Sequence, residues 1–260
     1  MPADIPSRPL PRLSEAPRLV ALVVCAALIA AGWLAMLAVH AESGVALDAI
    51  VALCGQIGSA AALWVYPSVA AMWLLMAVAM MLPTAIPTID AHADLVARLP
   101  DRRGLRSLLF VIGYLFAWAA FGLVAAALQI ALGAAIANGL SAATAAGAAL
   151  VIAGAYQFSA LKHACLTLCR NPMAYFLSRW CESLPGTFAM GVHHGIICVG
   201  CCWALMLLMF VTGAMNLIWM ALLGLLMLAE KTLPHARTWG RALGGLLILA
   251  GAVTLLRQLI

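Results

Sequence analysis

Charged residues are scarce in this chain of 260 residues, of which only 9% are Asp, Glu, Lys or Arg. A soluble domain averages about 25% charged residues and about half apolar ones. Here 66% of the residues are hydrophobic and the mean hydropathy is +1.09. This shortage of charge excludes an ordinary soluble domain and predicts an all-α, polytopic membrane helix bundle in contact with a lipid bilayer.

No motif that mixes aromatic and basic residues is present, so the formal net charge of +5 does not indicate a nucleic-acid partner. The basic residues lie instead between apolar runs, where they orient membrane proteins. The chain also shows no arrangement of nucleophile, base and acid, which argues against an enzyme. Its eight cysteines lie mostly in or beside apolar runs, where metal binding, redox work and inert packing compete as explanations.

Seven apolar runs are near the ~20 residues that a helix needs to cross a bilayer core. They are residues 19–39, 67–89, 107–131, 142–160, 189–212, 214–229 and 242–260. We expect a single transmembrane domain, 19–260, after a disordered N-terminal segment, 1–18. The short link at 213–216 predicts a tight hairpin between the fifth and sixth runs.

Four basic clusters set the expected orientation. They lie before the first run and around residues 98–106, 162–179 and 231–241. With seven spans all four fall on one side, so the positive-inside rule predicts a cytoplasmic N-terminus. If the apolar run 50–66 were an eighth span, the later basic clusters would fall on the opposite side from the first. We therefore expect that run to be interfacial or re-entrant.

The fifth run carries a stripe of soft-metal ligands. On a helix, His194, Cys198, Cys201 and Cys202 fall within an arc of roughly 100°. Met190 and Met206 extend the stripe by one turn in each direction. Thiolate, imidazole and thioether favour soft ions, Cu(I) first and zinc second, whereas the lack of a carboxylate argues against Mg²⁺, Ca²⁺ and Mn²⁺. Singly, Cys and Met are ordinary packing residues, but polar groups gathered within a membrane usually mark function.

Cys201 and Cys202 point about 100° apart, so further ligands to one ion must come from a neighbouring helix. In the second run, Met72, Met76 and Met80 repeat every four residues, and Met76 and Met80 are expected at the depth of Cys198 and Cys202. Pro83 and Pro87 are expected to break that helix. Alone, such a methionine stripe is typical of core packing.

A third group, Lys162, Cys165 and Cys169, shares one helical face on the expected cytoplasmic side. Lys162 and Arg170 are expected to favour thiolate there, so that Cys165 and Cys169 load metal from the cytosol. A basic helix with incidental thiols is the competing interpretation. Glu230 beside Lys231 predicts a helix cap or an ion pair.

Gly240 and Gly244 have the spacing of close helix packing, within the chain or between two copies in a homodimer.

Several of these segments together resemble a known family. They are Ala79-Met80-Met81-Leu82-Pro83, Tyr156-Gln157 through Cys169-Arg170, and above all His194-Gly195-x-x-Cys198-x-Gly200-Cys201-Cys202-Trp203. Over residues 67–255 the chain is similar to a bacterial family of unknown function whose members are described as predicted metal-binding integral membrane proteins. The resemblance implies location in the bacterial cytoplasmic (inner) membrane and a bound metal, without naming the metal or a reaction.

Three functions remain open. The first is copper handling, meaning transport, delivery or metalloenzyme assembly, with a metallochaperone or a membrane metalloenzyme as partner. The second is a thiol-disulfide oxidoreductase that uses Cys198 and Cys201, although an active redox pair normally sits at an exposed helix N-terminus. The third is a structural membrane subunit in which zinc or copper locks helices together.

Overall fold

In a computed structural model, the described residues are 16–42, 62–99, 101–212, 217–234 and 236–258. Over these residues the chain forms helices and no β-strand, which confirms the all-α class. The helices are α1 (Ala16–Glu42), α3 (Ala62–Val96), α4 (Arg103–Ala137), α5 (Ala142–Tyr156), α6 (Ala160–Arg170), α7 (Pro172–Arg179), α8 (Leu184–Met206), α9 (Leu208–Thr212), α10 (Leu217–Thr232) and α11 (Ala236–Leu256). Residues 1–15, the link at 213–216 and most of the run 50–66 lie outside this part of the chain.

Each of the seven apolar runs contains helix. Among the described residues, five helical segments are long and apolar enough to cross a membrane: Ala21–Ala38, Val65–Val96, Arg103–Ala137, Leu184–Phe210 and Ala236–Leu256. α5 and α6 meet at a bend of 64° and would make a sixth span if counted together. α10 has 16 residues, fewer than the ~20 that cross a bilayer core upright. The count of seven spans and their orientation therefore stay predictions.

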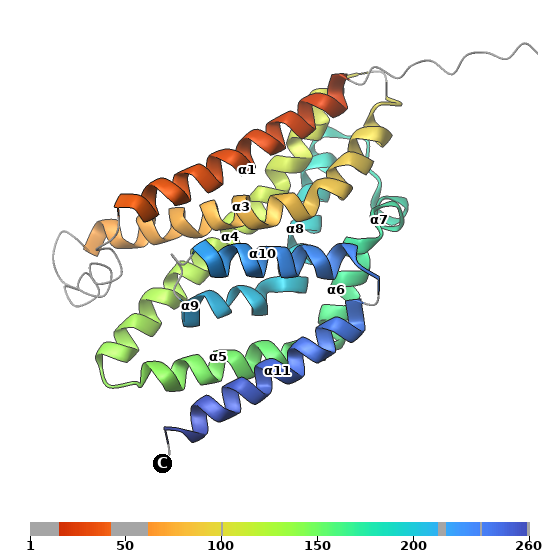
Figure 1. The fold of residues 1–260 in the computed structure, drawn as a ribbon. Coiled ribbons are helices and arrows are strands. Elements are labelled where there is room, and N and C mark those ends of the chain that lie inside the picture. The colour runs from red at the N-terminus through yellow and green to blue at the C-terminus, as the bar shows by residue number, and fades with distance from the viewer. Residues whose placement is uncertain (1–15, 43–61, 100, 213–216, 235, 259–260) are drawn as a thin grey trace, which may run out of the picture.

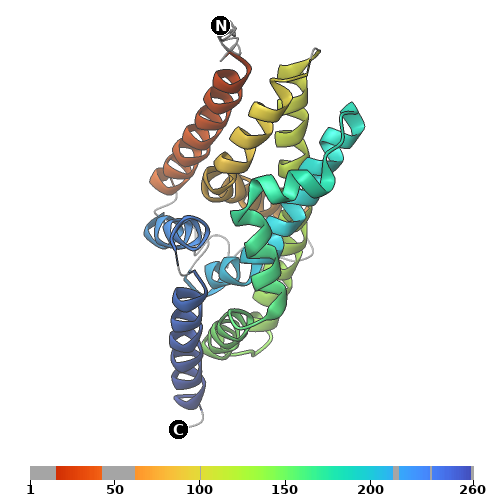
Figure 2. The same cartoon turned by 90° about the vertical axis from the view of Figure 1, so that its right-hand side faces the viewer.

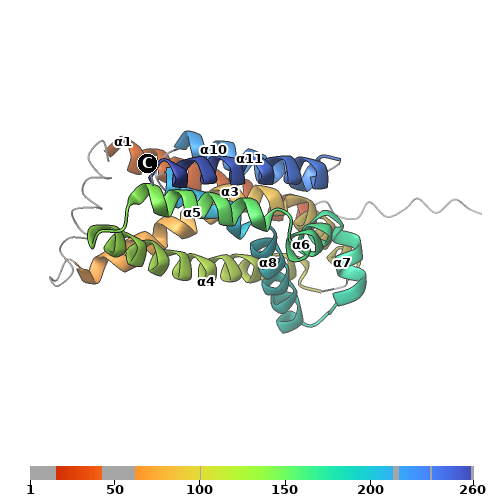
Figure 3. The ribbon, with the colours of Figure 1, turned by 90° about the horizontal axis from the view of Figure 1, so that it is seen from below.

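The helices pack in two groups that meet at α9 and α10. α3 lies between α1 and α4, and α4 packs along α8, while α5 pairs with α11 (Figures 1 and 3). Seen from the side, α1 and α11 lie at opposite ends of the molecule with α10 between them (Figure 2). α6 also packs on α8. As a result, α8 is contacted by α4, by α6 and by α10.

α3 continues through its prolines, contrary to the expected break. Pro67, Pro83 and Pro87 all lie inside the helix. A proline has no N–H, so Pro83 leaves the carbonyl of Ala79 without its helical donor. The indole Nε1 of Trp33 on α1 donates to that oxygen at 3.1 Å. The freed carbonyl thereby becomes a contact between α1 and α3, which helps the helix to continue through Pro83.

Glycines bring the helix pairs close together. A Cβ on Gly195 of α8 would lie 2.6 Å from Ala117 Cβ and 2.9 Å from the Tyr114 carbonyl on α4, so only glycine fits there. On α5 and α11, a Cβ on Gly154 would lie 2.7 Å from the Gly244 carbonyl. Gly244 is therefore used for packing inside the chain, and a homodimer through this glycine pattern stays a prediction.

Candidate metal centre

The centre consists of three cysteines of α8. Cys198, Cys201 and Cys202 have their sulfur atoms within 4.8 Å of one another, and each side chain is at most 2% exposed. Residues three and four apart lie one turn from each other on a helix. The thiols of Cys201 and Cys202 both donate back to the Cys198 carbonyl, at 3.1 Å and 2.9 Å. These bonds draw the two adjacent thiols together, although their Cα–Cβ bonds diverge.

Two neighbouring helices add sulfur at the ends of this group. Cys169 Sγ on α6 lies 3.9 Å from Cys201 Sγ, and Met81 Sδ on α3 lies 3.6 Å from Cys202 Sγ. The divergence of Cys201 and Cys202 thus aims one thiol at α6 and the other at α3. We call these five residues, Cys169, Cys201, Cys198, Cys202 and Met81, the sulfur row. It crosses three helices and holds the soft donors that Cu(I) prefers.

A lysine lies against the middle of the sulfur row. Lys231 Nζ at the end of α10 is 3.0 Å from Cys198 Sγ and donates to Thr84 Oγ1 at 2.7 Å. Tyr114 Oη is 3.1 Å from the same sulfur and donates to the Met81 carbonyl at 3.0 Å. An ammonium beside a thiol favours the thiolate, which is the form that binds metal. The centre therefore contains its own positive charge.

The residue before that lysine belongs to a different interaction. Glu230 forms a buried ion pair with Lys162 of α6, with Nζ to Oε2 at 2.8 Å and side chains 5% and 2% exposed. Lys162 also contacts Gln157 Oε1, and Arg170 donates to the Glu230 carbonyl at 2.8 Å. The ion pair predicted at Glu230 is thus present, but its partner is Lys162 and not Lys231. Lys162 is directed to this pair, so Lys231 is the lysine in contact with a thiol.

Cys165 lies beside the row. A Cβ on Gly200 of α8 would lie 2.8 Å from Cys165 Sγ, so this thiol rests against the bare backbone of α8. The Tyr156 hydroxyl donates to the Gly200 carbonyl at 2.5 Å. Cys165 and Cys169 are both half-buried, whereas the thiols of α8 are buried. The two cysteines of α6 therefore form the more accessible edge of the centre.

His194 lies one turn before Cys198, outside the group of three thiols. His194 is 2% exposed, and its ring centroid lies 5.9 Å from the ring centroid of Tyr114 and 5.2 Å from that of Tyr175. Its Nδ1 is buried without a hydrogen-bond partner. Burial raises the pKa of Tyr175 on α7, so its hydroxyl stays protonated and donates to the Met190 carbonyl at 2.7 Å. A metal-ligand role for His194 or Met190 stays a prediction.

The methionines of the stripe are all buried, but they do not all face the sulfur row. Met76, Met80 and Met206 are each at most 2% exposed. The thioether that contacts a thiol belongs to Met81, one position after Met80, which instead lines a cavity toward α10. Whether Met76, Met80 or Met206 holds metal stays a prediction.

Sequence reasoning missed Met81, Tyr114 and Lys231 as neighbours of the thiols. Met81 follows Met80 of the methionine stripe. The four-residue repeat of that stripe does not by itself predict which side of α3 packs against α8. In the sequence, Lys231 was noted only as the neighbour of Glu230, for which a helix cap or an ion pair was predicted. Only the packing of α10 against α8 brings it to Cys198.

Comparisons with known proteins agree with a copper-binding centre. No curated protein and no solved structure matches the chain. A family model described as "PpoB2: Copper chaperone" matches residues 70–254, which contain the whole sulfur row and Lys231. The match covers well over half of the chain and nearly coincides with the range 67–255 of the resemblance. The chain therefore belongs to the PpoB2 copper chaperone family.

Proposed function

We propose that this protein is a membrane-embedded copper chaperone that holds Cu(I) among Cys198, Cys201 and Cys202. The observation that carries the proposal is the group of three buried thiols with sulfur atoms within 4.8 Å. Thiolates are soft ligands, and no carboxylate belongs to the group, so the donor set suits Cu(I) better than hard cations. The membrane location rests on the five long apolar helices.

The sulfur row supports delivery of copper. A chaperone has to release its cargo, and a chain of closely spaced sulfur atoms lets an ion move by exchanging one Cu–S bond for another. Cys169 at the half-buried edge suits loading, and the buried thiols of α8 suit holding the ion away from water. The partners we propose are a metallochaperone that gives copper and a membrane metalloenzyme that receives it.

Disulfide exchange is the second candidate, favoured by Lys231 Nζ at 3.0 Å from Cys198 Sγ. An ammonium at this distance makes a thiol more nucleophilic. Exchange also needs access for the attacking partner, and Cys198 and Cys201 are 1% and 2% exposed. Burial of both thiols therefore favours metal binding.

Metal selectivity tests the proposed function. We expect the purified, reduced protein in detergent to take Cu(I) from a competing chelator and to hold it against excess Zn²⁺, because Cu(I) is the softer ion and the row adds the thioether of Met81 to its thiols. The measurement is elemental analysis after competition, together with thiol counting. Preferential retention of zinc would favour the structural subunit, and a stable Cys198–Cys201 disulfide without metal would favour the oxidoreductase.

Lys231 is expected to strengthen copper binding. Cu(I) held by two thiolates carries one net negative charge, which the ammonium beside Cys198 compensates. We expect Lys231→Met to weaken Cu(I) binding by roughly 10–100-fold, the range found for groups that support metal ligands. Lys231→Arg keeps the charge and is expected to lose less. Chelator competition measures both, and wild-type affinity in Lys231→Met would refute this role.

A further inference from the structure

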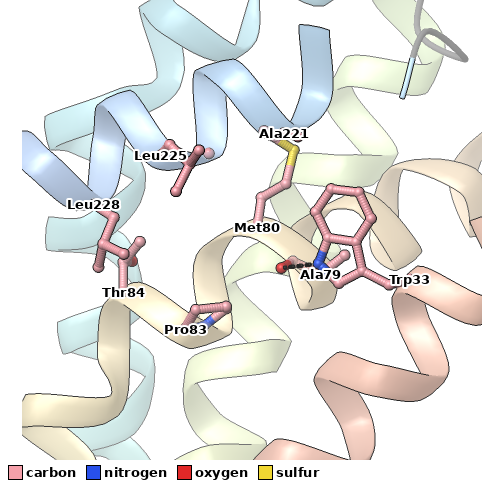
Figure 4. A pocket seen from close by; sticks show the side chains of 9 residues that line it. Trp33, Ala79, Met80, Pro83, Thr84, Ala221, Leu225 and Leu228 are labelled. Carbon is pink, nitrogen blue, oxygen red and sulfur yellow. Dashed lines mark hydrogen bonds between the residues drawn. The ribbon is translucent and has the colours of Figure 1, made fainter. Parts of the chain in front are cut away.

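A cavity of ≈ 260 Å³ lies between α1, α3 and α10. Figure 4 shows Trp33 of α1, Met80 and Thr84 of α3, and Leu225 of α10 around it. In another protein, an engineered cavity of about 150 Å³ with apolar walls stays dry and takes up benzene. The space between α1, α3 and α10 is therefore large enough to hold part of an apolar ligand.

The few polar side-chain atoms of the lining already have partners. The indole Nε1 of Trp33 donates to the Ala79 carbonyl at 3.1 Å (Figure 4). Thr84 Oγ1 donates to the Met81 carbonyl at 2.8 Å and accepts from Lys231 Nζ at 2.7 Å. The other lining side chains are those of Ala, Met, Pro, Gly and Leu, which carry no nitrogen or oxygen. A buried water needs roughly two to four polar partners, so this lining favours hydrocarbon over water.

The cavity opens to the surface of the described bundle at α10. Leu225 lines the cavity and is 64% exposed. Met80 and Pro83, which also line it, lie near the middle of the apolar segment Val65–Val96. The middle of a bilayer is hydrocarbon, so the acyl chains of lipids are what meets this opening.

Two small residues of α10 keep the space open. Gly224 and Ala221 both line the cavity, whereas most other residues of α10 are Leu, Ile, Met or Trp. A Cβ on Gly224 would lie 3.7 Å from Met80, which is an ordinary contact, so no close neighbour requires a glycine there. Glycine inside a helix is less favourable than leucine. An occupant of the cavity accounts for a small residue at a position with room for a larger one.

We propose that this cavity binds an acyl chain of a membrane lipid, which fills the space between α1, α3 and α10. The inference goes beyond copper binding and rests only on the membrane location in the proposed function. An empty space of this size would deprive its lining of dispersion contacts, and an acyl chain supplies them without needing a hydrogen bond. Because Lys231 lies near the end of α10, the bound lipid also supports the helix that places this lysine at Cys198.

Photolabelling in a bilayer tests the proposal. The protein is placed in vesicles of phosphatidylethanolamine and phosphatidylglycerol with a trace of a phosphatidylcholine that carries a diazirine in the middle of one acyl chain. Light converts the diazirine to a carbene, which bonds to the group beside it, and mass spectrometry locates the labelled residues. We expect labels on Met80 and Thr84, because these side chains are only 2% and 7% exposed and are reached by a chain that enters the cavity.

Variants that fill the cavity are expected to exclude the lipid. Gly224→Leu and Ala221→Leu each add a side chain from α10. We expect either variant to lower the labelling of Met80 and Thr84 by about tenfold or more, because each displaced methylene of the acyl chain costs about fourfold in affinity. As the matched control, Gly245→Leu adds the same side chain on α11, where a Cβ meets nothing within 4 Å, and is expected to label as the wild type does.

Two results would overturn the lipid site. One is labelling of the wild-type protein only at exposed residues such as Leu225, which would mean that no acyl chain enters the cavity. The other is wild-type labelling of Met80 in folded Gly224→Leu and Ala221→Leu. Failure of the wild-type protein to insert into the vesicles would instead overturn the membrane location in the proposed function.

Discussion

Replacing Cys198 and Cys201 together with serine is expected to reduce bound copper to the background level. Serine has nearly the shape of cysteine, but its hydroxyl is a poor ligand for a soft ion. The change removes two of the three thiols whose sulfur atoms lie within 4.8 Å, including the central one that contacts Lys231. Elemental analysis and chelator competition on the purified protein measure the loss.

Two cysteines outside the centre supply the control for this experiment. Cys25 is fully buried in α1, and Cys181 is exposed after α7; neither belongs to the sulfur row. The Cys25→Ser/Cys181→Ser variant loses the same number of thiols and is expected to keep wild-type copper content. Unchanged copper content in the Cys198→Ser/Cys201→Ser variant would show that the thiols of α8 do not bind the copper.

The second large effect is expected at the buried ion pair. Lys162→Met leaves the Glu230 carboxylate, 5% exposed, without its ammonium partner. Breaking a buried pair by removing one partner costs about 3–5 kcal/mol, because the remaining charge is uncompensated. Lys162 joins α6 to α10 and thereby helps to position Cys169 and Lys231 against the thiols of α8. We therefore expect a lower thermal unfolding midpoint in detergent.

A double variant distinguishes a lost charge partner from lost hydrogen bonds. In Lys162→Met/Glu230→Gln the buried charge is gone, and the new amide has a hydrogen-bond acceptor nearby in Gln157, whose Oε1 otherwise accepts from Lys162. We expect this variant to recover most of the lost stability. If the double variant is as unstable as Lys162→Met, the lost hydrogen bonds of the lysine matter rather than the unpaired charge of Glu230.

The helices and the thiol stripe were predictable because their causes are local. A run of apolar residues near bilayer length folds as a helix when it crosses a membrane, because its backbone N–H and C=O groups find no water there. The positions 194, 198, 201 and 202 fall on one side of any α-helix. The need for ligands from a second helix also followed from the divergence of Cys201 and Cys202, and Cys169 and Met81 now lie against them.

The contacts of the thiols were less predictable because they depend on how helices rotate and pair. A rotation of about 100° about the axis of α3 decides whether Met80 or Met81 faces α8. Neighbours in sequence, Glu230 and Lys231, point to different partners, Lys162 and Cys198. Pro83 was correctly predicted to cost α3 a backbone hydrogen bond. The helix nevertheless continues, because Trp33 of α1 donates to the freed carbonyl of Ala79.

In the proposed function, copper is held by the sulfur atoms of the row. X-ray absorption at the copper edge tests it most directly, on wild-type protein loaded anaerobically with an equimolar amount of Cu(I). We predict a Cu(I) edge whose nearest neighbours are sulfur, since Cys198, Cys201 and Cys202 lie together and Cys169 and Met81 flank them. Nearest neighbours that are only nitrogen or oxygen would contradict the claim.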